Sequence, residues 1–284
     1  MTRNLRRRFT DRLAFSGAYA LTGVALIPLA LVLFYTASRG LPAISHTEFF
    51  TNVERPVGVP GAGVAHAIVG TLILVGIASV AAIPIGVLGG IYLAEYGTNR
   101  IADGIRLGCD VLIGTPSIAI GLFAYALLVA PFHHFSGLSG SAALAVLMLP
   151  IVMRTTESAV SLIPGGLRES GLALGLARWR VSLQLILPAA APGVVTGALL
   201  SVARASGETA PLLFTGFGNP FLRFDPTQPM AALPLIVYHF ALLPYPSLQE
   251  QAWGAALVLV ILVLIINLVS RYVLRRQIRL AGQL

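Results

Sequence analysis

The sequence predicts an all-α integral membrane protein with six transmembrane helices. Its 284 residues are 56% hydrophobic, with a mean hydropathy of +0.85. Only 11% are charged, whereas soluble domains carry roughly 25%. Several segments stay apolar over the about 20 residues that a helix needs to cross the hydrocarbon core. Helices are the expected form, because each backbone polar group in lipid must be bonded within the chain.

The predicted spans follow one another with polar, glycine-rich or proline-rich connections. The first span follows an arginine cluster, as in a signal peptide, but its apolar run exceeds the about 7–15 residues of a signal-peptide core. We therefore expect an uncleaved helix. The fourth span is the weakest, since Arg154 and Glu157 interrupt its end. The six spans are residues 13–35, 67–93, 107–130, 142–160, 192–217 and 251–269.

The arginines orient these spans. All 19 basic residues are arginine, and with an internal N-terminus 15 of them fall in cytoplasmic segments, while Arg39, Arg55 and Arg223 fall outside. Cytoplasmic loops carry such an excess of positive charge, so both termini are predicted to be cytoplasmic. A pI near 10.4 could indicate nucleic-acid binding, but the arginines punctuate apolar segments instead of forming one basic surface. We expect no nucleic-acid partner.

Two connections are long enough to carry a function. Residues 157–190 form a cytoplasmic stretch with helix-forming residues around 167–176. Residues 218–248 form an external, proline-rich stretch whose apolar middle, residues 230–243, suits a short helix at the membrane interface. Glycines and prolines inside the spans are expected to permit close helix packing and kinks.

A charged pair, Arg204 and Glu208, lies inside the fifth predicted span. An arginine at the centre of a spanning helix costs about 2.5–3.5 kcal/mol and normally faces a protein interior or a water-filled path. The i, i+4 spacing places both side chains on one helical face. A guanidinium offers a planar donor fork that suits a tetrahedral oxyanion. The alternative is a structural salt bridge that touches no substrate.

Arg154 and Glu157 have two interpretations. They can snorkel to the cytoplasmic boundary, or they can line the inner end of a pathway. The hydroxyl groups of Thr155 and Thr156 could donate to an anion, but threonines in spans more often bond their own helix carbonyls.

Other chemistry is not expected. His133 and His134 are adjacent, so their side chains point apart, and no acidic or cysteine partner is near, which argues against a metal site. The glycines of residues 86–90 lack the Gly-Lys-Ser/Thr ending of a phosphate-binding loop, so the chain is predicted to bind no ATP and no cofactor. No nucleophile–base motif is present, and the chain is not expected to be an enzyme. The lone cysteine, Cys109, is predicted to be a buried small hydrophobe.

The cytoplasmic connection contains an acidic residue, two small residues and a glycine four positions beyond them. Such a segment forms a short helix with a thin face, over which a partner protein could close. From the residues alone, an amphipathic connector helix remains the alternative. The spacing, however, is similar to the EAA signature of ABC-importer permeases, with Ser-Gly in place of Ala-Ala and a leucine in place of isoleucine. The matching residues are Glu169, Ser170, Gly171, Gly175, Leu185, Leu187 and Pro188.

Three further segments narrow the resemblance. They are Arg204-Ala-Ser-Gly-Glu-Thr-Ala-Pro-Leu-Leu-Phe-Thr215, Pro150-Ile-Val-Met-Arg-Thr-Thr-Glu157 and Thr115-Pro-Ser117. Together they resemble the A-type permease subunits of bacterial phosphate ABC importers. The resemblance implies a MetI-like, type I importer permease domain at residues 66–271. Residues 1–65 would precede it as a cytoplasmic tail, the first span and an external loop, and residues 272–284 would follow as a cytoplasmic tail.

The resemblance also implies function and partners. The chain would be a permease subunit in a bacterial or archaeal inner (plasma) membrane, paired with a homologous C-type permease, a B-type ATPase dimer and an external phosphate-binding protein. Inorganic phosphate would be the cargo, and the EAA-type loop would dock the ATPase. The pathway residues would be Arg204, Glu208, Arg154, Glu157 and Thr209. The alternatives are a permease for sulfate or molybdate, and a stand-alone secondary transporter or channel.

Overall fold

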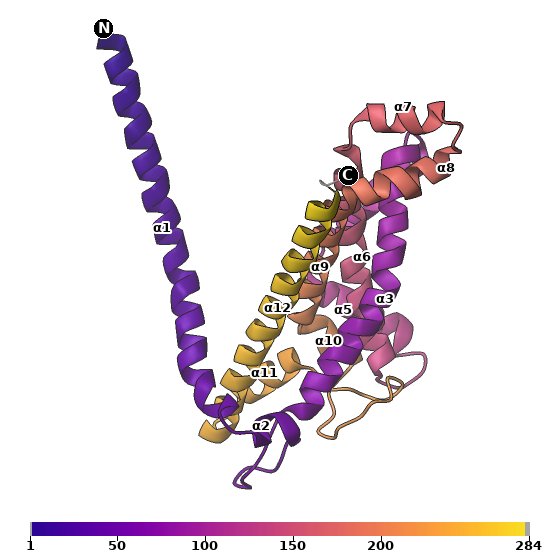
Figure 1. The fold of residues 1–284 in the computed structure, drawn as a ribbon. Coiled ribbons are helices and arrows are strands. Elements are labelled where there is room, and N and C mark those ends of the chain that lie inside the picture. The colour runs from indigo at the N-terminus through magenta and orange to yellow at the C-terminus, as the bar shows by residue number, and fades with distance from the viewer. Residues whose placement is uncertain (1, 282–284) are drawn as a thin grey trace.

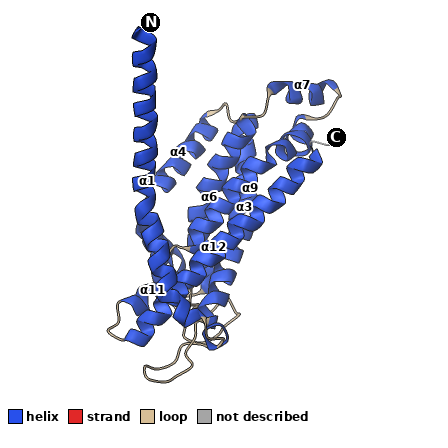
Figure 2. Cartoon of the chain, turned by 60° about the vertical axis from the view of Figure 1, so that its left-hand side comes forward, coloured by secondary structure: helices blue, strands red, loops and turns tan. Residues whose placement is uncertain are grey.

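A computed structural model describes residues 2–281, and within that range the chain is a bundle of helices with no β-strand (Figures 1 and 2). Five helical segments are long and apolar enough to cross a membrane, and a bent pair of helices is a sixth candidate. The segments are α1 (Thr2–Ile44), α3 (Ala65–Tyr96), α6 (Gly137–Ser161), the run Arg178–Ser206 and α12 (Pro246–Ala281). The helix α12 runs through most of the predicted C-terminal tail, whose residues 282–284 lie outside the described range.

The third predicted span is a bent pair and not the single helix expected over residues 107–130. α4 (Arg100–Gly114) and α5 (Ser117–Leu128) meet at an angle of 109°. The break falls at Thr115, which is extended (φ −76°, ψ 133°). Pro116 disfavours the helical conformation in the residue before it and has no backbone N–H to continue the helix. This break is not among the features predicted from the sequence.

The bent pair nevertheless carries the chain from one side of the bundle to the other. The start of α3 contacts the start of α11 (Leu233–Ala241), where Leu233 N donates to Thr71 Oγ1 at 2.8 Å. The end of α3 contacts α7 (Gly165–Ala173) instead, through Glu95 and Arg168. The start of α6 returns to the first side, because Gly137 N donates to Gln228 O at 2.9 Å. The segment between α3 and α6 therefore crosses the bundle.

The fifth predicted span begins earlier than expected and ends in a break. It consists of α8 (Arg178–Arg180), a π-helical segment η1 (Val181–Ile186) and α9 (Leu187–Ser206), followed by α10 (Ala210–Thr215). Gly207 caps α9, and Pro211 stands in the first turn of α10, where its fixed φ favours a new helix start. The expectation that Arg204 lies at the middle of one continuous helix is therefore wrong, since Arg204 is in the last turn of α9.

Glycines bring α3, α6 and α9 into close contact, as predicted. A Cβ atom on Gly86 would lie 2.7 Å from Val152 Cβ, and one on Gly90 would lie 2.6 Å from Met153 O. A Cβ atom on Gly197 of α9 would collide with Thr155 of α6. Small residues allow helices in lipid to approach until their backbones touch. The three helices therefore form one tightly packed unit.

The opposite side of the bundle from α7 is covered by short elements. α2 (Glu48–Thr51) and α11 (Leu233–Ala241) lie there beside the start of α12 (Figure 1). Phe49, Leu233 and Phe240 are buried in a common apolar cluster. The short helix predicted within residues 230–243 is thus confirmed as α11.

The first helix diverges from the rest of the bundle. α1 meets α12 only toward its C-terminal end, where the rings of Tyr35 and Trp253 lie edge to face with centroids 5.1 Å apart (Figure 1). Residues 15–35 are exposed along their whole length. In the described part of the chain, no other segment covers this apolar surface. The start of α1 and the end of α12 lie on the same side as α7 (Figures 1 and 2).

Candidate functional site

Arg204 and Glu208 form an ion pair across the break that ends α9. Arg204 Nε donates to Glu208 Oε1 at 3.3 Å, longer than the about 2.7–2.9 Å of a strong charge-assisted bond. The Arg204 side chain is 43% exposed and that of Glu208 is 14% exposed. The predicted contact is confirmed, although Glu208 lies beyond the helix. The loose geometry leaves much of the guanidinium free to meet an anion.

Thr209 follows directly and is the N-cap residue of α10. Its side chain is half-buried and makes no capping hydrogen bond, while its carbonyl accepts a hydrogen bond from Leu213 N at 3.1 Å. The break thus places an arginine, a carboxylate and a threonine hydroxyl within six residues of chain. The backbone at the break is held by short turns, in which Gly207 N donates to Arg204 O and Glu208 N donates to Ala205 O.

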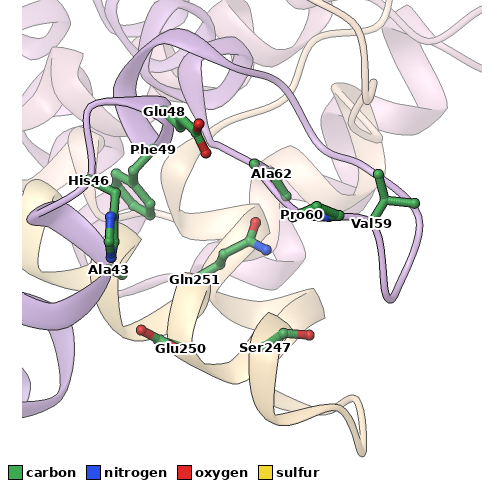
Figure 3. Close-up of a pocket in the computed structure, with 11 residues that line it drawn as sticks. Ala43, His46, Glu48, Phe49, Val59, Pro60, Ala62, Ser247, Glu250 and Gln251 are labelled. Carbon is green, nitrogen blue, oxygen red and sulfur yellow. The ribbon is translucent and has the colours of Figure 1, made fainter.

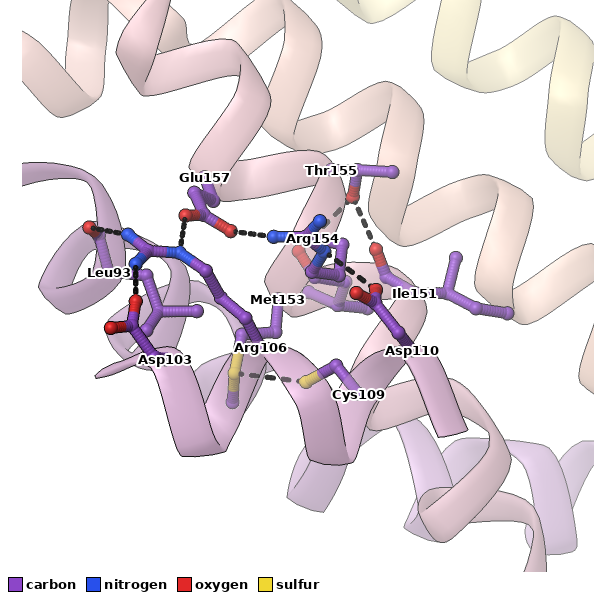
Figure 4. A network of polar contacts seen from close by, with 11 residues as sticks. Leu93, Asp103, Arg106, Cys109, Asp110, Ile151, Met153, Arg154, Thr155 and Glu157 are labelled. Atoms are coloured by element: carbon purple, nitrogen blue, oxygen red, sulfur yellow. Dashed lines mark hydrogen bonds and ion pairs between the residues drawn. The ribbon is translucent and has the colours of Figure 1, made fainter. Parts of the chain in front are cut away.

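Arg154 and Glu157 belong to a second charged cluster, between α4 and α6 (Figure 4). One carboxylate oxygen of Glu157 accepts from Arg154 Nη1, and the other accepts from Arg106 Nε at 2.6 Å. Arg154 Nε also lies 3.2 Å from Asp110 Oδ1. The Glu157 side chain is only 12% exposed, so two guanidinium groups enclose one nearly buried carboxylate.

The α4 members of this cluster are not among the site residues predicted from the sequence. The sequence pattern indicates only a topological charge at Arg106, yet this residue bonds Glu157, Asp103 Oδ1 at 3.0 Å and Leu93 O at 2.9 Å (Figure 4). Asp103, Arg106 and Asp110 are three and four residues apart and so share one face of α4. That spacing is the signal that could have revealed them.

The two threonines differ. Thr155 Oγ1 donates to its own helix, 2.7 Å from Ile151 O and 3.1 Å from Val152 O, which confirms the structural alternative for this residue. Thr156 is fully buried, and its hydroxyl has no hydrogen-bond partner in the described part of the chain.

The two charged clusters are separate. Thr155 of α6 lies against Gly197 of α9, and Arg204 follows Gly197 by seven residues, or about 10 Å along a helix. In residues 2–281, no ion pair or hydrogen bond joins Arg204 or Glu208 to the α4–α6 cluster. The structure therefore places Arg204 and Arg154 at two different depths of the bundle.

The EAA-type segment forms a short exposed helix, α7, with a closed end. Leu176 N donates to Gly171 O and Gly175 N donates to Leu172 O, which is the Schellman arrangement that ends helices at a left-handed residue. Gly175 takes that conformation, with φ +78°. Its lack of a side chain is thus required by the backbone turn.

The other EAA-type residues divide into an outer and an inner set. Glu169 and Ser170 are exposed, whereas Gly171 is buried. A Cβ atom on Gly171 would lie 2.8 Å from Leu185 Cδ1 and 2.9 Å from Val181 Cγ2. The small size of Gly171 therefore serves packing within the chain. Leu187 is half-buried and Pro188 is exposed, at the start of α9.

A hollow on the far side from α7 is a poor candidate for an anion site. Its volume is about 310 Å³, and it lies between the end of α1, α2 and the start of α12 (Figure 3). Glu48, Glu250 and His46 line it, and no arginine does. Two carboxylates would repel an anion.

Comparison with known proteins supports a membrane transport role. Residues 86–279 match the family model of the binding-protein-dependent transport system inner membrane component. The phosphate transport system permease protein PstA of Yersinia pestis is 40% identical over 272 residues, covering 95% of this chain and 92% of that protein. PstA of Xylella fastidiosa is 44% identical over 241 residues, covering 84% and 83%. PstA 1 of Mycobacterium tuberculosis is 39% identical over 284 residues, covering 97% and 92%.

Solved structures share the fold. The inward-facing MetNI methionine ABC transporter superposes with a TM-score of 0.58 at 20% identity, covering 75% of this chain and 93% of that chain. An amino acid ABC transporter gives a TM-score of 0.55 at 17% identity, covering 84% and 98%. The predicted MetI-like, all-α membrane fold is confirmed. The chain belongs to the family of binding-protein-dependent transport system inner membrane components and, within it, to the PstA permeases.

Proposed function

We propose that this chain is the membrane permease subunit of an ATP-driven phosphate importer. The observation that carries the proposal is the near full-length similarity to phosphate permeases, 40% identity over 95% of the chain for the Yersinia pestis protein. The subunit itself hydrolyses no ATP. It forms part of the translocation pathway and transmits the work of a separate ATPase.

In this proposal, Arg204 is the anion-binding residue of the pathway. Its guanidinium is nearly half exposed on the surface of the single chain, its charge cannot be lost, and its planar fork can hold two oxygens of one phosphate. Glu208 weakens the hold, which suits a transporter that must release its cargo, and can accept a proton from a protonated phosphate. Thr209 adds a hydroxyl donor beside them.

The α4–α6 cluster is proposed to line the inner end of the same pathway. Arg106 and Arg154 together hold the carboxylate of Glu157. Because Arg154 is 35% exposed, an arriving phosphate can compete with Glu157 and Asp110 for its donors. Glu157 then displaces the phosphate again. The exchange of one oxyanion for another would pass the cargo onward without leaving a buried arginine uncompensated.

Coupling is proposed to run through the EAA-type loop. Glu169 offers an exposed charge on α7, and Leu172 and Leu174 expose apolar surface beside it, at 49% and 81%. An ATPase dimer would bind this surface, while Gly171, Leu187 and Pro188 join α7 to the start of α9. Closure of the ATPase would then rock the helices between inward-facing and outward-facing states.

The remaining partners follow from the same proposal. A homologous permease would cover the exposed Arg204 side and complete the pathway between two chains. An external binding protein would deliver phosphate on the side of α2 and α11. The chain would lie in the inner or plasma membrane with both termini in the cytoplasm, and the exposed apolar surface of α1 would contact lipid or the partner permease.

The direct test is uptake by reconstituted vesicles that contain the chain, its partner permease, the ATPase and the binding protein. Phosphate should accumulate only when ATP is present on the side of the membrane where the ATPase is bound. Excess sulfate or molybdate should not compete with phosphate for uptake. Competition by sulfate or molybdate would favour a permease for another oxyanion. Phosphate movement by the chain alone, without an ATPase, would indicate a secondary transporter or channel.

A further inference from the structure

A buried carboxylate outside the proposed pathway is held by the loop that carries α7. Glu95 stands in the last turn of α3, and its side chain is 5% exposed. Arg168 of α7 donates to its carboxylate, and Arg178 of α8 donates to the backbone oxygen of Glu95. We propose that Glu95, Arg168 and Arg178 form a clamp that transmits the movement of α7 to α3. The inference rests on the proposed function and names the residues through which the loop acts.

Arg168 is fixed by several hydrogen bonds. Its Nε and Nη2 both lie 2.8 Å from Glu95 Oε1, its Nη1 donates to Ile163 O at 2.6 Å, and its Nη2 also donates to Val160 O at 2.9 Å. The two carbonyls belong to the end of α6 and the turn after it. One guanidinium thus ties α7 to the ends of both α3 and α6.

Arg178 holds the same helix end from the other side of the loop. Its Nη2 donates to the backbone oxygen of Glu95 at 2.7 Å, and its guanidinium carbon lies 4.9 Å from the centroid of the Tyr96 ring. Cations are favoured at the C-terminal end of a helix, where the carbonyls lack partners. Arg168, before the Gly175 turn, and Arg178, after it, therefore both contact the C-terminal end of α3.

The clamp lies between the exposed surface of α7 and the packed transmembrane helices. The outer surface of α7 is exposed at Glu169 and Leu172, and its inner side is tied to Glu95. From α3 the contact continues to α6, where Gly86 lies against Val152 and Gly90 lies against Thr156 and the backbone of Met153. Close-packed elements transmit displacement because they cannot deform continuously. Apolar contacts alone could slide, whereas Arg168 donates two N–H groups to one oxygen of the nearly buried Glu95 carboxylate, and such a charge-assisted contact fixes one register.

A positioning role makes a prediction that a purely structural role does not. Without the clamp, an ATPase still binds α7 and still hydrolyses ATP, but the movement of α7 no longer displaces α3. The quantity to measure is therefore phosphate imported per ATP hydrolysed, together with the yield of assembled complex. Both are measured in vesicles containing the complete complex.

The variants are Glu95→Gln, which removes the charge and keeps the shape, and Arg168→Gln. The matched control is Arg180→Gln, because Arg180 is exposed and contacts the ring of its neighbour Trp179, without an ion pair in the described part of the chain. We expect phosphate per ATP to fall about tenfold for the first two, within the range of coupling effects along packed networks, and to stay unchanged for the control. Arg168→Lys should recover less than half, since it lacks the fork.

Two outcomes would overturn the clamp. If the Glu95→Gln and Arg168→Lys variants assemble and import as much phosphate per ATP as the unaltered complex, the contact does not transmit the movement of α7 to α3. If phosphate uptake and the yield of assembled complex fall in equal proportion, and the phosphate imported per ATP hydrolysed stays constant, the contact is only structural. Failure of the proposed function looks different, because then the unaltered complex itself binds its ATPase yet moves no phosphate.

Discussion

Arg204 donates to Glu208 across the break between α9 and α10, so the pair depends on the turn at Gly207 and not on a continuous helix. Gly207 is exposed at this break, and so is the side chain of Arg204. A polar break inside a membrane protein is tolerated where it lines a cavity or is covered by protein. The Arg204 side of this chain is therefore expected to face a pathway completed by another chain.

Topology is the first prediction. Cysteines introduced at Asn52 and Asn219, in a Cys109→Ala background, should react with an impermeant thiol reagent from outside intact cells. A cysteine at Trp179, beside α7, should react only after permeabilisation. Labelling of the Trp179→Cys variant from outside would contradict the orientation derived from the arginines.

The second prediction concerns the close packing between α6 and α9. Gly197→Ala adds a methyl group where Thr155 already lies, and overpacking of this kind costs about 1–3 kcal/mol. Gly76→Ala is the matched control, because a Cβ atom at Gly76 meets nothing within 4 Å. Thermal unfolding of the purified chain in detergent should show a lower midpoint for Gly197→Ala alone. Equal midpoints would mean that the two helices are not in contact at this point.

The third prediction concerns the turn after α7. Gly175 has φ +78° with open space around it, so a β-branched residue is disfavoured by backbone strain of roughly 1–2 kcal/mol and not by a clash. Gly175→Val should therefore reduce binding of the ATPase in pull-downs, and Gly175→Asn should retain most of it, because asparagine tolerates this conformation. Glu169→Lys should also reduce binding, by reversing an exposed charge. If all three variants bind and transport normally, α7 is only a connector.

The fourth prediction concerns Glu157. Glu157→Gln leaves Arg106 and Arg154 without the carboxylate they share and should lower the free energy of unfolding by roughly 1–3 kcal/mol, as for a buried charged partner that is lost. Asp103→Asn is the control, since Asp103 bonds the same Arg106 but is 74% exposed, and exposed pairs contribute about 0–1 kcal/mol. Denaturation of the two variants side by side compares them. A larger loss for Asp103→Asn would mean that Glu157 does not hold the cluster together.

The sequence predicted the apolar helices, α7 and α11 because each rests on a local pattern of hydropathy or spacing. It did not predict the breaks at Thr115 and Gly207. Proline alone does not reveal such breaks, since Pro84, Pro150 and Pro192 lie inside continuous helices of this chain. Nor did it predict the pairing of Arg106 with Glu157 or of Glu95 with Arg168. Their partners are 51 and 73 residues apart, so the contacts depend on how the helices pack.

The central claim is that Arg204 binds phosphate during passage, and four variants of one pair test it. Complex yield and ATP-dependent phosphate uptake are measured together for Arg204→Ala, Arg204→Lys, Glu208→Gln and the double variant Arg204→Leu with Glu208→Leu. We predict normal assembly with no uptake for Arg204→Ala, poor uptake for Arg204→Lys because a point charge lacks the fork, and slower turnover for Glu208→Gln. A structural ion pair can be replaced by apolar residues of similar volume without loss, so phosphate transport by the double variant would contradict the claim.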